Sequence, residues 1–190
     1  MHASEGSQDW IEAALAEMAA GGVERVRVEV LAERLGVTKG GFYRRFKDRR
    51  ALLDAVLEAW TAGRIAAIET QTELGGDTPQ RRLESLIRLY SERLNPQGMA
   101  IELAIRQWAR SDRAAAAAAA RVDAARLARV ARLYARLGLG PAEAEARAVL
   151  FYAFIFGQSL LFLEEPLRKR QKLAAACAAV LTAVAGTGRT

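Results

Sequence analysis

Seven lysine and arginine residues gather within a short stretch, residues 34–50, in which the only acid is Asp48. Residues 1–33 carry two arginines against seven acids, so the charge changes sign abruptly where this stretch begins. The cationic residues are Arg34, Lys39, Arg44, Arg45, Lys47, Arg49 and Arg50. Clustered lysines and arginines neutralise phosphates, and such a cluster is more informative than a high overall pI, here about 10.0. The stretch therefore predicts contact with a nucleic-acid backbone.

A short helix and a tight turn are predicted to precede the cationic side chains. Leu31, Ala32 and Leu35 form an apolar stripe at helical spacing. Gly36 follows directly, at a position where a helix ends and the backbone can need a positive φ. Thr38 is then placed to cap a second helix through its hydroxyl group. The pattern indicates two short helices joined by a turn.

The second helix has an aromatic inner side and a cationic outer side. Phe42 and Phe46 lie one turn apart and are predicted to point inward. Two adjacent glycines, Gly40 and Gly41, cost roughly 1 kcal/mol each relative to alanine in a helix, and close approach to a nucleic acid supplies a reason for them. This is the spacing of a helix-turn-helix, whose second helix enters the major groove of DNA. The residues predicted to point outward are Lys39, Gly40, Tyr43, Arg44 and Lys47.

These residues carry a family resemblance. The segment V-L-A-E-R-L-G-V-T-K-G-G-F-Y-R-R-F, followed by K-D-R-R-A-L-L-D-A-V-L, resembles the DNA-binding domain of TetR-family transcriptional regulators. The family commonly has a histidine two residues after the tyrosine and a lysine at the start of the fourth helix, where this chain has Arg45 and Arg49. Both departures keep or add positive charge, although Arg45 cannot reproduce the geometry of the contact that the histidine makes in the family. The rest of the chain resembles the family in length, helical pattern and its last two helices.

We expect ten residues to contact DNA, with roles set by their positions. Lys39 and Arg44 are candidates for reading base edges, because the first residues of a recognition helix lie nearest the bases and arginine pairs well with guanine. Tyr43 and Lys47 are assigned to phosphates, the alternative for Tyr43 being a packing aromatic. The remaining candidates include Gly40 and Gly41, which allow close approach, and Thr38, which caps the helix, contacts phosphate or does both. Arg45 and Arg49 are assigned to phosphates, the alternative for Arg45 being a solvated or ion-paired side chain. Arg27, near the start of the preceding helix, is a further candidate.

The composition argues against other functional classes. A single cysteine, Cys177, and a single histidine, His2, leave no disulfide within the chain, no His/Cys metal site and no Ser-His-Asp chemistry. No phosphate-cradling G-x-x-x-x-G-K-[ST] loop occurs. We therefore expect no enzyme activity, no metal and no cofactor. Because no signal sequence and no uncharged apolar run of about 18 residues occurs, we expect a cytoplasmic protein without a membrane span.

The helical pattern predicts an all-α fold of about nine helices. Alanine is abundant and there are only four prolines, which favours helix throughout. The expected division is a helix-turn-helix DNA-binding domain over residues 9–54 and a ligand-sensing and dimerisation domain over residues 55–188. We expect the first helix to begin after Asp9, behind a polar tail, and the sixth to cover residues 99–110. Asp48 and Asp112 are placed to cap the fourth and seventh helices.

The last two helices, residues 141–164 and 167–185, carry more apolar surface than one small domain can bury. This pattern indicates a homodimer, and the family resemblance implies that these helices form a four-helix interface between subunits. In the resembled family, helices five to eight enclose an inducer. That implies a set of ligand candidates, each of which could equally belong to the core: Tyr90, Met99, Leu103, Arg106, Gln107, Trp108, Phe151, Phe154 and Gln158.

Arg106 has two alternative partners. It could meet an anionic or carbonyl-bearing ligand, or it could pair with Glu102 one helical turn away.

Two regulatory hypotheses follow. The first is a repressor that a small-molecule ligand releases from a pseudo-palindromic operator, repression being the family habit. The alternative is a helix-turn-helix regulator without small-molecule input, controlled by a protein partner or by its abundance. A purely structural helical bundle would leave the abrupt change of charge and the paired glycines unexplained.

Overall fold

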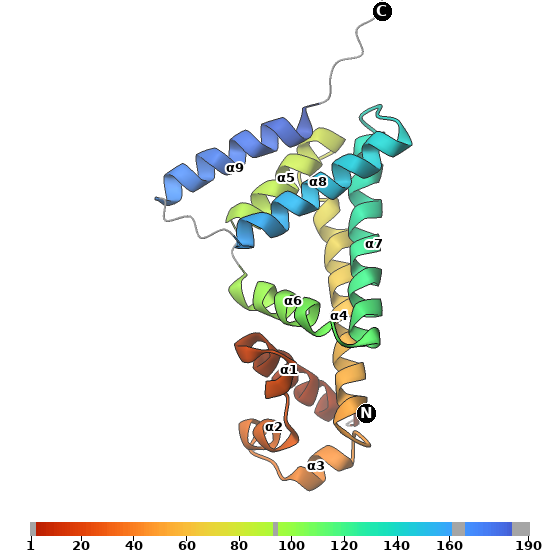
Figure 1. Ribbon diagram of the computed structural model, residues 1–190, viewed down its shortest axis with the longest axis vertical. Helices are drawn as coiled ribbons and strands as arrows, with labels where there is room; N and C mark the ends of the chain where they lie inside the picture. Colours follow the sequence, from red (N-terminus) through yellow and green to blue (C-terminus); the bar gives the residue numbers. More distant parts are fainter. Residues whose placement is uncertain (1–2, 93–94, 161–165, 184–190) are drawn as a thin grey trace, which may run out of the picture. The chain divides into compact units, whose positions relative to one another are not determined.

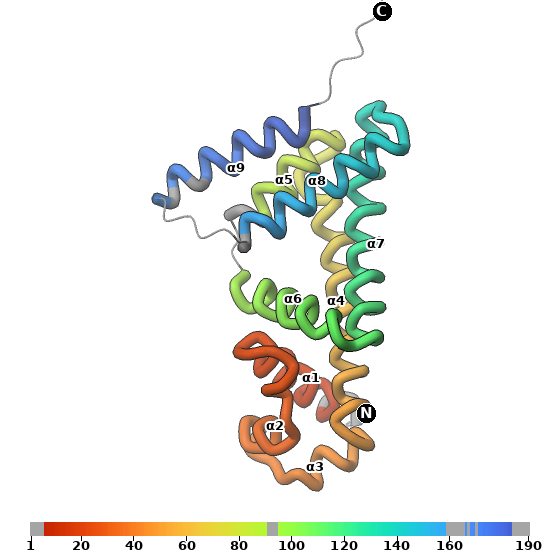
Figure 2. Tube along the Cα trace, viewed as in Figure 1, coloured from red at the N-terminus to blue at the C-terminus, as the bar shows by residue number. Residues whose placement is uncertain are grey.

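The computed structural model describes residues 3–92, 95–160 and 166–183. Within these ranges it contains nine α-helices and one short 3-10 helix, with no strand, which confirms the predicted all-α fold (Figures 1 and 2). No helix there is both long and apolar enough to cross a bilayer. The elements are α1 (Ala3–Gly21), η1 (Val23–Arg25), α2 (Val28–Leu35), α3 (Lys39–Tyr43), α4 (Arg49–Thr72), α5 (Pro79–Glu92), α6 (Pro96–Trp108), α7 (Arg113–Ala135), α8 (Pro141–Leu160) and α9 (Leu167–Thr182).

The chain packs as two compact units whose boundaries fall inside α4 and α7. The first contains Met1–Arg64 and Asn95–Val122, and the second contains Ile65–Leu94 and Asp123–Thr190. The predicted division into a DNA-binding domain (residues 9–54) and a sensing and dimerisation domain (residues 55–188) is a division by function, and it stays a prediction. Some sequence predictions lie outside the described residues: those for His2, for the end of the eighth helix (161–164) and for residues 184–188.

An aromatic cluster holds the helices at the N-terminal end of the first unit. Trp10 of α1 meets Phe42 of α3 edge-on, with ring centroids 5.3 Å apart, and Phe46 lies 5.6 Å from Phe42. All three rings are buried, together with Met18 and Leu31. α1 also packs along α6 and against α2. The inward direction predicted for the two phenylalanines is therefore confirmed.

Two helix starts differ from the sequence prediction. α1 begins at Ala3 rather than after Asp9, so the predicted polar tail is helical from residue 3. α6 begins at Pro96 rather than at residue 99, because the side chain of Asn95 accepts a hydrogen bond of 2.8 Å from the Gly98 amide. A proline suits this first helical position, where no N–H is needed.

The two predicted aspartate caps are confirmed. The Asp48 carboxylate accepts from the Ala51 amide at 2.8 Å at the start of α4. The Asp112 carboxylate accepts from the amides of Ala114 and Ala115, at 2.9 and 3.0 Å, at the start of α7. Each cap satisfies N–H groups that the first turn of a helix leaves without partners.

The second unit has its own core, in which α5 packs against α8 and α9 (Figure 1). Leu83, Tyr134 and Phe151 are fully buried within it. The Tyr134 hydroxyl donates to the Leu181 carbonyl at 2.9 Å and so ties α7 to α9. Burial raises the pKa of Tyr134 to about 12, which keeps this phenol protonated as a donor at neutral pH.

Candidate nucleic-acid interface

The turn between α2 and α3 is fixed by Gly36. Its φ of 65° lies in the left-handed region, as the sequence predicts. The Gly36 amide donates to the Glu33 carbonyl at 3.1 Å, and the Val37 amide donates to the Ala32 carbonyl at 3.0 Å. This pair of bonds is the Schellman arrangement that ends a helix within one residue. As a result, α3 starts only four residues after α2 ends.

α3 is shorter than the stretch from Thr38 to Lys47, which holds eight of the ten predicted DNA contacts. α3 ends at Tyr43, and one further turn follows, in which the Phe46 amide donates to the Phe42 carbonyl at 2.9 Å. Thr38 occupies the N-cap position, but its side chain makes no capping hydrogen bond. The predicted hydroxyl cap is therefore wrong, and the exposed Thr38 side chain is placed at the surface beside Lys39.

The predicted DNA-contacting side chains lie at the surface around α3. The Tyr43 ring is 62% exposed while the neighbouring Phe42 ring is fully buried, so Tyr43 is not a core aromatic. Eight of the candidates are exposed, and Gly41 and Arg49 are partly buried. The eight are Arg27, Thr38, Lys39, Gly40, Tyr43, Arg44, Arg45 and Lys47.

The paired glycines are not required by the fold. A Cβ built at Gly40 would come no closer than 3.6 Å to Thr38 Oγ1, and one at Gly41 would come no closer than 4.0 Å to Val37. Both are ordinary contacts, and neither glycine has a positive φ. Internal packing would therefore tolerate alanine at either position.

Two arginines of the predicted set have partners within the chain. Arg49 donates from Nε to the Val26 carbonyl at 2.5 Å and from Nη2 to the Val23 carbonyl at 2.6 Å, so it fastens the start of α4 to η1. Arg45 lies against α1, where a Cβ at Gly6 would come within 2.1 Å of its Nη2. The partners of Arg49 could not be read from sequence spacing, because they lie more than 20 residues away along the chain. Arg45 also donates from Nη1 to the Gly41 carbonyl, one turn back, at 3.4 Å.

A buried carboxylate that the sequence did not single out joins three elements of the first unit. Glu17 of α1 accepts from Arg25 of η1 at 3.0 Å and from Arg34 of α2 at 2.8 Å. Burial by itself raises the pKa of the Glu17 carboxyl, but the hydrogen bonds from the two arginines outweigh it and hold the pKa below its ordinary value of 4.5. Glu17 therefore positions α2, and with it the turn into α3.

The ligand candidates divide between the two units. Arg106 donates from Nε to Glu102 at 2.9 Å, and Glu102 is only 1% exposed, so of the two alternatives the structure shows the intrahelical pair. Tyr90 donates its hydroxyl to Gln71 at 2.8 Å, and Phe151 is fully buried. The first unit holds Met99, Leu103, Arg106, Gln107 and Trp108, and the second holds Tyr90, Phe151, Phe154 and Gln158.

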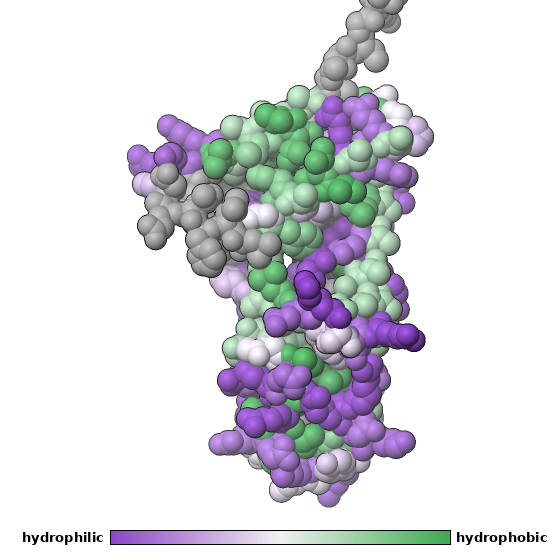
Figure 3. Space-filling view, viewed as in Figure 1, coloured by the Kyte–Doolittle hydropathy of each residue, from purple (hydrophilic) through white to green (hydrophobic). Residues whose placement is uncertain are grey.

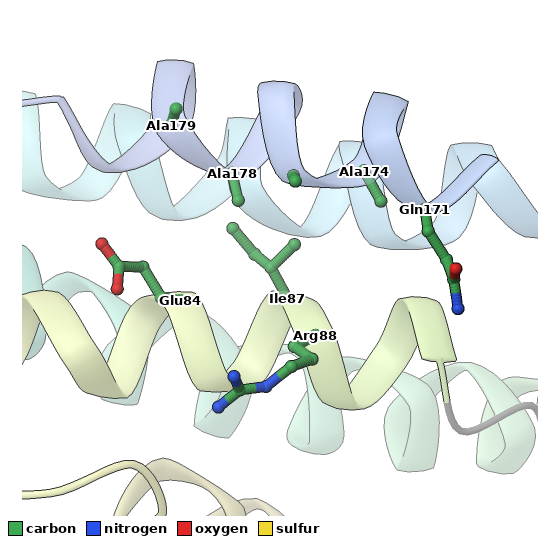
Figure 4. Close-up of a pocket in the computed structure, with 8 residues that line it drawn as sticks. Glu84, Ile87, Arg88, Gln171, Ala174, Ala178 and Ala179 are labelled. Carbon is green, nitrogen blue, oxygen red and sulfur yellow. The ribbon is translucent and has the colours of Figure 1, made fainter. Parts of the chain in front are cut away.

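Each unit contains a hollow of ligand size. In the first, a hollow of about 570 Å³ lies against α1, η1 and α6, and its lining includes Leu103, Gln107 and Trp108. In the second, a hollow of about 280 Å³ lies between α5 and α9. Figure 4 shows Ile87 pointing toward the alanines of α9 in this hollow, with Glu84 and Gln171 toward its two ends. A third hollow, of about 540 Å³, lies between α7 and α8.

Comparison with known proteins places this geometry in a family. Residues 11–56 match the family described as bacterial regulatory proteins, tetR family. No curated protein matches the chain in sequence. Among solved structures, a transcriptional regulator from Rhodococcus sp. is similar, with a TM-score of 0.73, 20% identity and 93% of each chain covered. A transcriptional regulator from Aquifex aeolicus has a TM-score of 0.66 and 19% identity over 93% of this chain and 99% of its own.

A further likeness is a bacterial regulatory protein in the tetR family from Rhodococcus, with a TM-score of 0.67 and 20% identity over 93% of this chain and 95% of its own. At these identities the structural likenesses show the fold alone. The match over residues 11–56 shows a DNA-binding segment of the tetR family of bacterial regulatory proteins, as the sequence motif indicates. Regulators of this family are DNA-binding transcription factors and not enzymes.

We predict that Glu17→Gln destabilises the protein near neutral pH by about 1.5 to 3 kcal/mol, the range for hydrogen bonds to charged groups. The low end is expected because the side chains of Arg25 and Arg34 are about half exposed, at 54% and 49%, and water screens them. Because the pKa of Glu17 is lowered in the folded state, its contribution is fully present above pH 4.5 and is lost as the pH falls through the folded value.

Denaturant unfolding of both proteins between about pH 3 and pH 8 measures this difference. Glu12→Gln, at an exposed position on the same helix, is the matched control. A stability gap that stays constant down to the lowest pH would contradict the role given to the Glu17 carboxylate.

Proposed function

We propose that the chain is a homodimeric repressor that leaves a pseudo-palindromic operator when a small-molecule ligand binds. The observation that carries the DNA-reading part is the outward side of α3. There, exposed cationic and tyrosine side chains flank a glycine pair that the chain's own packing does not require. The proposed division of labour is DNA binding by residues 9–54 and sensing and dimerisation by residues 55–188. The site of action is the cytoplasm, where the operator lies.

The roles proposed for the reading side chains follow their positions. Lys39 at the first position of α3 and Arg44 directly after its end are proposed to meet base edges. Tyr43 and Lys47 are proposed to hold phosphates, since a phenol hydroxyl and an ammonium group both donate to phosphate oxygens. Arg27, Thr38 and Arg45 are proposed to add backbone contacts from the same exposed surface. Arg49 is proposed to act mainly by holding α4 on η1, its remaining N–H groups facing phosphate.

The dimer proposal is supported by apolar side chains that the folded chain leaves exposed. Val149 and Leu150 of α8 are 54% and 59% exposed, and Leu173 and Val180 of α9 are 52% and 75% exposed. Figure 3 shows hydrophobic surface gathered over the α8 and α9 region of the second unit. Exposed apolar clusters of this kind mark association surfaces, and a two-fold dimer would present two copies of α3 to successive turns of DNA, about 34–36 Å apart.

The ligand proposal is supported by the hollows within the units. A site of a few hundred Å³ with a mostly apolar lining and a few placed polar groups is typical for small molecules, and the α5–α9 hollow has this composition. A ligand would release DNA by binding more tightly to a dimer whose two α3 helices are wrongly spaced. If no small molecule shifts operator affinity, the protein is instead regulated by a protein partner or by its abundance.

Replacing individual reading side chains tests the DNA assignment. We expect Tyr43→Ala to weaken binding to every duplex by a similar factor, because a phosphate contact is independent of sequence. We expect Lys39→Ala and Arg44→Ala to change the order of preference among operators, each by about 1–3 kcal/mol at one base pair. Fluorescence anisotropy on matched and singly mismatched duplexes measures both effects. If either Lys39→Ala or Arg44→Ala lowers affinity equally for all sequences, that residue does not read a base.

Charged substitutions on the exposed apolar surface test the dimer. We expect Leu150→Glu and Val180→Glu to convert the protein to monomers, because each would bury a carboxylate at the interface. Leu74→Glu, at a position 46% exposed outside α8 and α9, is the matched control and should remain dimeric. Sedimentation velocity measures the change. A wild-type monomer, or a Leu150→Glu variant that dimerises as Leu74→Glu does, would contradict the proposed interface.

A further inference from the structure

An exposed acid lies beside the first residue of the recognition helix. The Glu29 carboxylate of α2 is 2.8 Å from the Lys39 ammonium of α3, and both side chains are more than half exposed. Between Arg27 and Arg50 the other two acids are Glu33 and Asp48, and the Asp48 carboxylate caps α4. A carboxylate on a surface that meets phosphates opposes DNA binding. Its presence at this position therefore calls for a compensating function.

The surroundings of Lys39 suggest what that function is. Lysine has a long flexible side chain, and its neighbours Gly40 and Gly41 have no side chains to pack against it. The ion pair with Glu29 therefore crosses from the first helix of the motif to the second and restrains the ammonium group. The hydrogen bond from Lys39 is the largest cause that lowers the pKa of the Glu29 carboxyl, and Arg27 lowers it further, so the acid is charged at neutral pH.

We propose that Glu29 is a specificity-determining positioning residue that holds the Lys39 ammonium toward base edges and away from phosphates. An unrestrained lysine at this position would bind any nearby phosphate, which adds affinity for all DNA alike. A restrained lysine side chain loses less conformational freedom when it meets its base, so affinity for the operator rises relative to affinity for random sequence. Glu29 thus acts on the ratio between operator affinity and non-specific affinity. This inference rests on the proposed role of Lys39 as a reader.

The test compares Glu29→Gln with Glu33→Gln, which removes the same charge from an exposed position on the same helix. Affinities of the full chain for its selected operator and for a scrambled duplex are measured across a salt series. Both variants should bind the scrambled duplex more tightly. We expect only Glu29→Gln to lower the ratio of the two affinities, by about fivefold or more, and to steepen the salt dependence of scrambled-duplex binding by about one unit as Lys39 turns to phosphate.

A second background separates positioning from charge. In Lys39→Met protein, Glu29→Gln should change the affinity ratio no more than Glu33→Gln does, because the restrained group is gone. Equal effects of the two glutamine substitutions in wild-type protein, or an undiminished effect of Glu29→Gln in the Lys39→Met background, would overturn the inference. The proposed DNA-reading function, on which the inference about Glu29 rests, would instead fail on either of two results. One is a wild-type chain that prefers no duplex, and the other is a Lys39→Met variant that keeps the wild-type preference for the operator. Thermal melts confirm that each variant is folded.

Discussion

The burial of Phe42 is the interaction on which the proposed DNA-binding surface depends. A helix of five residues that contains two glycines cannot hold its own shape or direction in water. Its orientation comes from outside, through the contacts of the Phe42 ring with Trp10 and Phe46 and through the turn closed at Gly36. With Phe42 pointing inward, the side chains on the other side of α3 must face solvent. The same arrangement exposes Tyr43, its immediate neighbour in the chain.

The positive charge around the motif serves two different purposes. Arg25 and Arg34 are bound to the buried carboxylate of Glu17, and Arg49 is bound to backbone carbonyl groups, so these three arginines stabilise the helical arrangement. Lys39 and Arg44 are exposed on or beside α3, with Lys39 in an ion pair with the exposed carboxylate of Glu29. A count of basic residues over 25–50 cannot separate the two groups. Only the second group belongs to the surface proposed to read DNA, while the first fixes where that surface lies.

Local patterns in the sequence predicted much of this architecture. The all-α fold, the left-handed Gly36, the inward phenylalanines and the Asp48 cap follow from interactions within a few residues, which spacing alone reveals. Contacts between distant segments were not predictable in that way. In the sequence, Glu17 is one of several acids on an amphipathic helix, and only the folded chain shows that it pairs with Arg25 and Arg34.

The failures of prediction have physical causes of the same kind. Threonine favours the N-cap position, yet the Thr38 side chain makes no capping bond there and only its backbone adopts the cap conformation. The sequence predicts that the sixth helix starts after Gly98, whereas the cap from the Asn95 side chain allows it to start at Pro96. For Arg106, the sequence leaves two partners open, and the buried carboxylate of Glu102 one turn away is the one it meets.

Two copies of the α3 surface are proposed to read one operator. Selection of duplexes from a random pool by the purified full-length chain tests this proposal most directly. We expect an enriched inverted repeat whose half-sites are separated by one helical turn, about 10 base pairs, or a multiple of it. A pool that yields no preferred sequence, or a single site without two-fold symmetry, would contradict it.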